Sequence, residues 1–321
     1  DKSYMQTAIR LSAVDYIFKP FALSDLLTAV EKAIHRLRTS VHSDLHTTDD
    51  DLALKVLYKS SSPDFQRYLK ELTLPVSFSK AYVVILIRLN SGITFSSQKI
   101  LDSLELQTVT NNYYHMIKAE LPKTLSTESM ISKCGDGYII FSNVPDTCTQ
   151  NSLSEQLASL PTIFHEVNIA LGVSQIYHSP DFINKAFCES RTAALTAFFK
   201  GYKHIFFTQT QQIHTFSADH NARKCYFECL EKLNISQASS YLEDYFVYLS
   251  NCDVQYISDI RDDLLHLTLH LYKKLKNPPS QLISEFINQA ATLEDIQFYV
   301  QHLLTLYLSE VEHKNNYSKI V

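Results

Sequence analysis

Two histidines are the first candidates for metal chemistry in this sequence. His266 and His270 stand four residues apart, which is the spacing of the two zinc ligands in an H-E-x-x-H helix. However, Leu267 occupies the position of the catalytic glutamate, and the sequence offers no evident third ligand. We therefore interpret the two histidines as neighbours on a helix face and expect no metal site there.

Two cysteines give a second candidate. Cys225 and Cys229 are also four residues apart and could share a metal, but no second pair has the spacing of a zinc ribbon. The six cysteines are scattered along the chain, as in proteins with reduced thiols, and do not suggest a disulfide framework. We expect core or surface thiols and a cytoplasmic protein.

Glycine is scarce, with five residues in a chain of 321. The five are Gly92, Gly135, Gly137, Gly172 and Gly201. Phosphate-binding loops need several closely spaced glycines, so Rossmann and P-loop folds are excluded. The one close pair flanks Asp136, which we interpret as an ordinary turn residue, because aspartate tolerates unusual backbone angles.

Charge and hydropathy exclude further classes. The net charge of -5 gives no electrostatic footprint for nucleic acid, and the apolar runs are too short for a membrane span. The composition, 45% hydrophobic and 20% charged, is that of globular domains. The opening Asp1-Lys2-Ser3 does not resemble a signal peptide, and the missing initiator methionine predicts a fragment.

The amino-terminal residues predict a short α/β unit. Residues 3–12 favour a helix, residues 14–18 a strand, and Ser24 caps a second helix. Apolar residues recur along one side of that second helix, and we interpret the resulting stripe as a possible homodimer interface. The stripe consists of Leu26, Val30, Ile34 and Leu37.

The string Ala-Val-Asp-Tyr-x-x-Lys-Pro-Phe at residues 13–21 resembles the last strand of two-component receiver domains. The resemblance implies that Lys19 contacts the phosphoryl group, a role suited to a compact cation, although a surface lysine is the alternative. It also implies that Tyr16 is the switch aromatic and that Pro20 follows a cis peptide bond. Ser12 stands where the family usually has glycine.

The receiver resemblance covers residues 1–38, the carboxyl-terminal part of such a domain. Its phosphoacceptor aspartate, its magnesium-binding acidic pair and its switch serine or threonine would all precede residue 1. We therefore expect no cofactor in this chain, with Mg²⁺ needed only by an intact receiver. The implied partner of the intact receiver is a cognate sensor histidine kinase.

Residues 39–78 predict a polar linker and two connecting helices, interrupted at residues 60–63. From residue 79 to residue 210 the pattern changes to alternating strands and helices. The strands are expected at residues 82–89, 130–134, 138–142, 167–174 and 204–208. The helices are expected up to Leu121, near residues 152–160, and from Ser179 to Gly201. This order is that of the palm-like nucleotide cyclase fold.

Residues 134–138, Cys-Gly-Asp-Gly-Tyr, and the string Ile-Ala-Leu-Gly-Val-Ser at 169–174 carry a second resemblance. They resemble the degenerate GGDEF-like domain of YesN-like AraC-type response regulators. In active members, a first-strand aspartate and a hairpin acidic pair bind two metals. Here Arg88 and Asn90 hold the first-strand positions, and Gly137 replaces the hairpin glutamate. The hairpin Gly135, Asp136 and Gly137 is therefore expected to be catalytically inactive.

Residues 211–321 predict amphipathic helices at 222–233, 236–249, 257–275, 282–290 and 292–314. Thr292 and Asp295 have the spacing of a capping box. The segment resembles the helical linker that precedes the AraC-type helix-turn-helix domain. That DNA-binding domain is not in this sequence, so we expect DNA binding only through it.

The expected fold is an α/β receiver fragment, an α+β degenerate GGDEF-like (nucleotide-cyclase palm) domain and an all-α helical segment. The expected function is that of a response regulator and transcription factor, in which these parts relay receiver phosphorylation without enzymatic activity and without membrane contact. The alternative is a regulatory module that senses a small ligand or nucleotide without turnover. An enzyme would instead form product from a purine triphosphate with Mg²⁺.

Overall fold

The computed structural model describes residues 51–90, 103–125, 128–135, 137–163, 167–208, 214–276 and 283–317. From Asp51 onward the chain forms one compact unit. Several of the predicted site residues lie outside the described residues. They are Lys19, Tyr16, Pro20, Asp136 and the stripe Leu26, Val30, Ile34 and Leu37.

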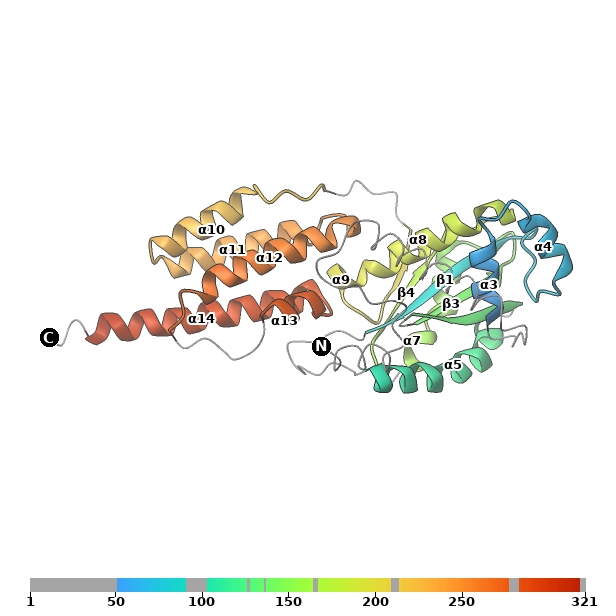
Figure 1. The fold of residues 1–321 in the computed structure, drawn as a ribbon, viewed down its shortest axis with the longest axis horizontal. Coiled ribbons are helices and arrows are strands. Elements are labelled where there is room, and N and C mark those ends of the chain that lie inside the picture. Colours follow the sequence, from blue (N-terminus) through green and yellow to red (C-terminus); the bar gives the residue numbers. More distant parts are fainter. Residues whose placement is uncertain are drawn as a thin grey trace, which may run out of the picture. The chain divides into compact units, whose positions relative to one another are not determined.

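A five-stranded sheet forms the centre of the first half of this unit (Figure 1). The strands are β1 (Tyr82–Leu89), β2 (Ser129–Cys134), β3 (Gly137–Asn143), β4 (Ile169–Val173) and β5 (Ile205–Phe207). Their order in the sheet is β2-β3-β1-β4-β5. β1 is antiparallel to both neighbours, with Ile85 opposite Ile140 on β3 and Val173 on β4, and β5 is parallel to β4. The predicted strand order along the chain is confirmed.

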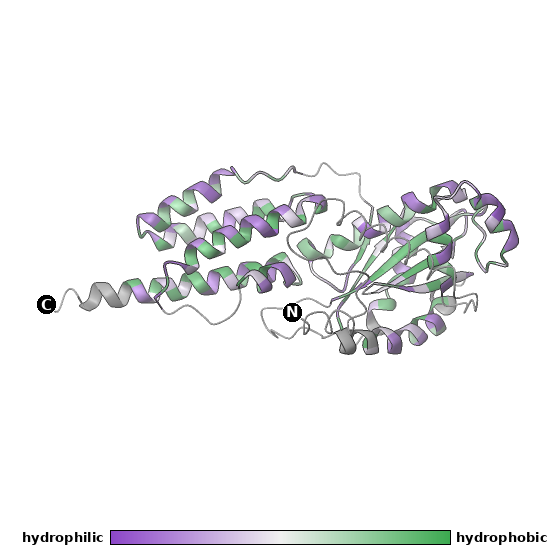
Figure 2. Cartoon of the chain, in the orientation of Figure 1, coloured by the Kyte–Doolittle hydropathy of each residue, from purple (hydrophilic) through white to green (hydrophobic). Residues whose placement is uncertain are grey.

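The sheet is apolar on both faces, as the continuous hydrophobic run of β1 predicts. Tyr82 and Val84 face one core, which α3 (Leu52–Lys59) and α8 (Ile183–Leu195) cover. Val83 and Ile85 face the other core, which α5 (Ser103–Leu125) and α6 (Gln150–Leu157) cover. Figure 2 shows the strands mostly in the hydrophobic colour, whereas the covering helices carry both colours. The sheet is therefore the middle layer of an α/β/α arrangement.

Two helices confirm the predicted connection before the sheet. They are α3 and α4 (Phe65–Glu71), and they are separated by the turn that contains Pro63. After β3 in the chain, the helix predicted near residues 152–160 is divided into α6 and a short α7 (Leu160–Ile163).

The prediction that α5 ends before Pro122 is wrong, because the helix runs on to Leu125. Proline in a helix interior removes one backbone hydrogen bond. The burial of Ile117, Leu121 and Leu125 at four-residue spacing outweighs that loss, since all three are at most 2% exposed. The Thr124 hydroxyl also donates to the carbonyl of Glu120 (3.0 Å), within the same last turn.

Signals at Ser179 and Gly201 correctly bound the helical segment after β4. The Ser179 hydroxyl accepts a hydrogen bond from the backbone of Asp181 (3.3 Å), and a 3₁₀ turn, η2 (Pro180–Phe182), leads into α8. The segment then continues as α9 (Ala197–Lys200) and stops at Gly201, whose φ of 82° favours glycine.

Gly172 permits the close approach of α8 to β4. A Cβ atom at this position would lie 2.0 Å from the carbonyl oxygen of Ser190 and 2.4 Å from the backbone nitrogen of Ala194. Because both are backbone atoms, a larger residue would push the helix away from the sheet.

The second half of the unit is helical (Figure 1). Its helices are α10 (Asn221–Glu231), α11 (Ile235–Leu249), α12 (Ile257–Tyr272), α13 (Ile283–Gln289) and α14 (Leu293–Tyr317), with a 3₁₀ turn, η3 (Val254–Tyr256). Leu264 and Leu267 of α12 and Leu303 of α14 belong to their shared core. The expected helices are thus confirmed. No helix among the described residues is long and apolar enough to cross a membrane.

The predicted capping box at the start of α14 is confirmed. The Thr292 hydroxyl accepts from the backbone of Asp295 (3.1 Å), and the Asp295 carboxylate accepts from the backbone of Thr292 (3.1 Å). These two contacts satisfy donors that the first turn of a helix otherwise leaves unpaired.

Candidate functional site

The β2–β3 hairpin places Gly135 and Gly137 on either side of Asp136, which lies outside the described residues. Gly135 has a φ of 59°, and no atom lies within 4 Å of where its Cβ would be, so it serves the turn. Gly137 begins β3 and lies opposite Arg88 of β1. The structure therefore brings together two of the positions that the sequence singled out.

Gly137 is packed directly against the β1 backbone. A Cβ atom there would lie 1.9 Å from the carbonyl oxygen of Ile87 and 3.2 Å from the Cα of Arg88. A glutamate at this position would require the two strands to separate. Arg88 and Gly137 thus stand at two positions where an active cyclase would need metal-binding carboxylates. Neither residue supplies an oxygen ligand from its side chain.

The structure places His266 and His270 on one helix, α12. His270 contacts Glu231 of α10 (Nε2 to Oε1, 3.2 Å), and Lys274 also donates to that carboxylate (2.7 Å). The bond from Lys274 and then that from His270 lower the pKa of Glu231. Among the described residues, no group of three or more candidate ligands is placed to hold a metal. The pair instead belongs to the contact between α10 and α12.

The thiols of Cys225 and Cys229 lie on α10 in different surroundings. Cys229 is buried at 9% exposure, with its sulfur 3.9 Å from Gln237 Oε1, and Cys225 is half-buried. The charge that ionised thiols would carry, that of Cys225 foremost, raises the pKa of the neighbouring Tyr241. Both cysteines are part of the packing between α10 and α11.

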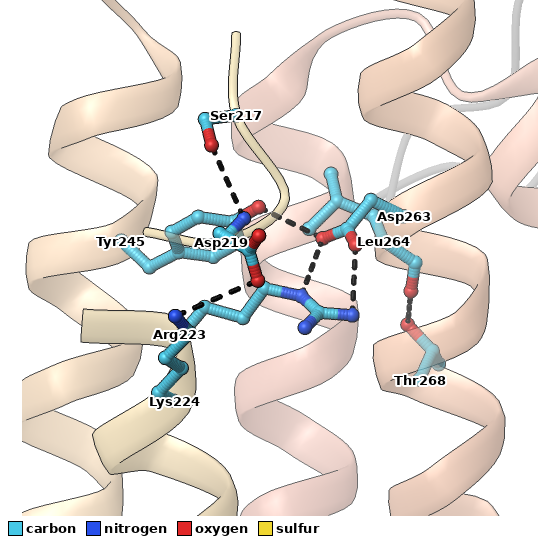
Figure 3. A network of polar contacts seen from close by, with 8 residues as sticks. All are labelled: Ser217, Asp219, Arg223, Lys224, Tyr245, Asp263, Leu264 and Thr268. Carbon is cyan, nitrogen blue, oxygen red and sulfur yellow. Dashed lines mark hydrogen bonds and ion pairs between the residues drawn. The ribbon is translucent and has the colours of Figure 1, made fainter. Parts of the chain in front are cut away.

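Sequence reasoning did not find the polar network in the helical core, shown in Figure 3. Asp263 of α12 receives two bonds from Arg223 of α10, at 3.0 Å from Nε and 2.9 Å from Nη2. Tyr245 of α11 donates its hydroxyl to the same carboxylate (2.8 Å). The Asp263 side chain is 7% exposed and that of Arg223 is 18% exposed. Three helices therefore meet at one buried charged group.

The surroundings of Tyr245 keep its hydroxyl protonated. Burial, and then the adjacent Asp263 carboxylate, raises the pKa of Tyr245, so the phenol remains a donor. One signal could have revealed the network. Asp263 lies on the apolar stripe of α12, three residues after Ile260 and next to Leu264, where an uncompensated charge would be costly.

A second missed residue, Arg261 of α12, contacts both α13 and the end of the sheet domain, as we call residues 82–208. Its guanidinium donates to the carbonyls of Ile287 and Ala290 at the end of α13, the latter at 2.8 Å. Its Cζ lies 4.6 Å from the ring centroid of Phe198 in α9. Burial, and then the charge of Arg88, lowers the pKa of Arg261 to about 10.

Phe198 itself belongs to the core of the helical bundle, although α9 follows directly from α8 of the sheet domain. The phenyl ring is 2% exposed. We call the contact of Phe198 and Arg261 the α9–α12 junction. The junction places a ring of α9 in the bundle core, and α9 follows directly from α8, the helix that covers β4.

Comparison with known proteins adds one structural match. No family model and no curated protein matches the sequence. Among solved structures, the chain is similar to the diguanylate cyclase SiaD of Pseudomonas aeruginosa, solved in complex with its activator SiaC. The two are 12% identical, with a TM-score of 0.25, and the match covers 64% of this chain and 87% of that one. At these values the match carries no functional argument. The described residues form a mixed α/β sheet domain that is followed by a helical bundle.

Proposed function

We propose that this chain is a signal-relaying part of a two-component response regulator and transcription factor, with a GGDEF-like middle domain that has no cyclase activity. The receiver-like string of residues 13–21 and the hairpin string of residues 134–138 support this proposal. An intact receiver would be phosphorylated by a sensor histidine kinase. The relay would then bias the arrangement of the helical bundle in a homodimer and thereby DNA binding.

The proposed lack of cyclase activity rests on the packing of Gly137 against the backbone of Ile87. A two-metal cyclase needs carboxylates at the first strand and the hairpin, because Mg²⁺ is bound through oxygen ligands. With Arg88 and Gly137 at these positions, a cation stands at one and the other has no space for a side chain. This chemistry favours a structural role for the hairpin.

The relay itself is supported by the α9–α12 junction. Regulation requires a coupling free energy between the responding parts. Phe198 packs in the bundle core, and Arg261 binds both this ring and the end of α13. A movement of α8 and α9 would therefore change the packing of α12 and α13.

A turnover assay tests the absence of cyclase activity. The purified chain is incubated with GTP and Mg²⁺, and products are separated by chromatography, with an active diguanylate cyclase as the positive control. We expect no cyclic dinucleotide above the protein-free background. Formation of product by the wild-type chain would overturn the proposal.

A second function, sensing of a small ligand without turnover, is favoured by one observation. A small pocket lined by charged side chains lies between α3 and α4, next to the sheet domain. Ligand sensing there and signal relay through α8 could operate in the same molecule.

A further inference from the structure

The pocket between α3 and α4 has a volume of about 240 Å³. Pockets for drug-sized ligands run from about 300 to 1,000 Å³, so this one suits a smaller molecule. Its lining combines both charge signs with an aromatic ring. The lining residues are Lys59, Ser62, Asp64, Arg67, Tyr68 and Glu71.

The charges in this pocket balance, since Lys59 and Arg67 oppose Asp64 and Glu71. No ion pair within 4.0 Å joins these four described side chains to one another or to any other described residue. Arg67 and Glu71 even have the spacing at which opposite charges on a helix commonly pair. The pocket therefore presents two donors and two acceptors of opposite charge that remain available to a ligand.

Tyr68 supplies the apolar part of the lining. It is half-buried, and burial raises the pKa of its phenol. Asp64, Arg67 and Tyr68 lie three and four residues apart, hence on one side of α4 and its N-cap. A small ligand could thus contact both charge signs and the face of one ring.

The turn that forms the pocket is attached to the start of α8. Gln66 donates to the Asp181 carboxylate (3.2 Å), and Asn184 donates to the Ser61 hydroxyl (2.8 Å). Occupation of the pocket would therefore restrain the same helix that leads to the α9–α12 junction. Through these hydrogen bonds, a bound ligand would influence the position of α8 and thereby the packing of the bundle.

We propose that the α3–α4 pocket binds a small zwitterion, a free α-amino acid. Its carboxylate contacts Arg67 and Lys59, its ammonium group contacts Asp64 and Glu71, and its side chain lies on the Tyr68 ring. Charge-assisted hydrogen bonds of this kind are stronger than those between neutral groups. This site is separate from the hairpin, so its binding does not depend on the proposed lack of cyclase activity.

The experiment is a thermal-shift screen of the full chain with the common L-amino acids, followed by calorimetric titration of the best one. A ligand that binds only the native state raises Tm by an amount that grows with the ligand concentration. Propionate and ethylamine serve as matched probes, because each carries only one of the two charges of alanine. We expect at least one amino acid to raise Tm with increasing concentration and to give a saturable calorimetric isotherm, and neither probe to raise Tm at the same concentration.

Two charge-removing variants and one control complete the test. Arg67→Gln and Asp64→Asn should each weaken the affinity at least tenfold. Lys70→Gln, an exposed charge of the same helix that does not line the pocket, should leave the affinity unchanged. Unliganded Tm values should stay close to wild type, because Arg67, Asp64 and Lys70 are exposed. No stabilisation by any amino acid, equal stabilisation by propionate, or equal weakening by Lys70→Gln would overturn the proposal.

Discussion

The sheet domain and the helical bundle hold their elements in place by different means. The sheet domain buries apolar side chains on both faces, and its buried polar groups are small, such as Ser132 and Ser174. These hydroxyls accept bonds from the backbones of Ala53 (3.1 Å) and Val84 (2.9 Å). The helical bundle instead buries a carboxylate, Asp263, together with its arginine and tyrosine partners.

The difference follows from where each element makes its backbone hydrogen bonds. Strands pair with their neighbours, so the ladder between β1 and β3 fixes their register without help from charged side chains. Helices satisfy their backbones internally, and apolar surfaces alone permit several alignments. We infer that Asp263 selects one alignment of α10, α11 and α12. The bundle is therefore the region whose geometry a small change can reset.

The largest expected effect comes from Asp263→Ala. Loss of this carboxylate leaves the guanidinium of Arg223 buried and unpaired and the Tyr245 hydroxyl without an acceptor, which should cost about 3 kcal/mol of unfolding free energy. Urea unfolding measures the loss, and hydrogen exchange should accelerate in α10–α12 more than in β1. Asp262→Ala, the exposed neighbour, should cost under about 0.5 kcal/mol. Equal costs for the two aspartates would contradict the role of the network.

The next effect tests the sheet domain. Gly172→Ala places a Cβ against the backbone of α8 and should cost about 2 kcal/mol through overpacking. Gly135→Ala meets no atom within 4 Å and carries only the strain of its positive φ, about 1 kcal/mol. Here hydrogen exchange should accelerate first in β4 and α8. A larger loss for Gly135 than for Gly172 would refute the close-packing explanation.

A smaller effect is expected at the start of α14. Thr292→Ala removes the side chain that accepts from Asp295 and should cost about 1 kcal/mol, the usual worth of an N-cap. Thr305→Ala on the exposed side of the same helix should cost less, as measured by urea unfolding. If both changes cost the same, the capping box contributes nothing to bundle stability.

The smallest effect depends on pH and concerns the surface contact of Glu231. Its pKa is lowered from 4.5 by Lys274 and His270, so the folded protein holds this carboxylate ionised more readily than the unfolded chain does. The contribution is fully present above pH 4.5 and is lost as the pH falls through the lowered pKa. The stability difference between wild type and Glu231→Gln should therefore shrink in acid. A constant difference between pH 7 and pH 3 would contradict this assignment.

Local pattern predicted most of the elements but little of what connects them. The apolar run of β1 and the signals at Ser179 and Gly201 act within a few residues, and each was interpreted correctly. The prediction that the helix ends before Pro122 failed because the tertiary burial of Leu125 outweighs the local loss of a backbone hydrogen bond.

The contacts between distant residues were beyond such patterns. Arg223 and Asp263 are 40 residues apart, and nothing at Arg223 distinguishes it from a surface arginine. The position of Asp263 on an apolar stripe was the one available signal. Likewise, the sequence alone shows that Arg88 and Gly137 replace the carboxylates of active cyclases. The lack of space for a side chain at Gly137 became evident only from the pairing of β1 with β3.

We infer that the sheet domain and the bundle are energetically coupled through the α9–α12 junction. A double-mutant cycle tests it most directly, with Phe198→Leu, Arg261→Gln and the combined variant compared by urea unfolding. We predict a coupling free energy of about 1 kcal/mol, because the guanidinium and the ring are largely desolvated. The control cycle of Phe198→Leu with Asp262→Asn should be additive. Additivity within about 0.3 kcal/mol in the Arg261 cycle would contradict the relay.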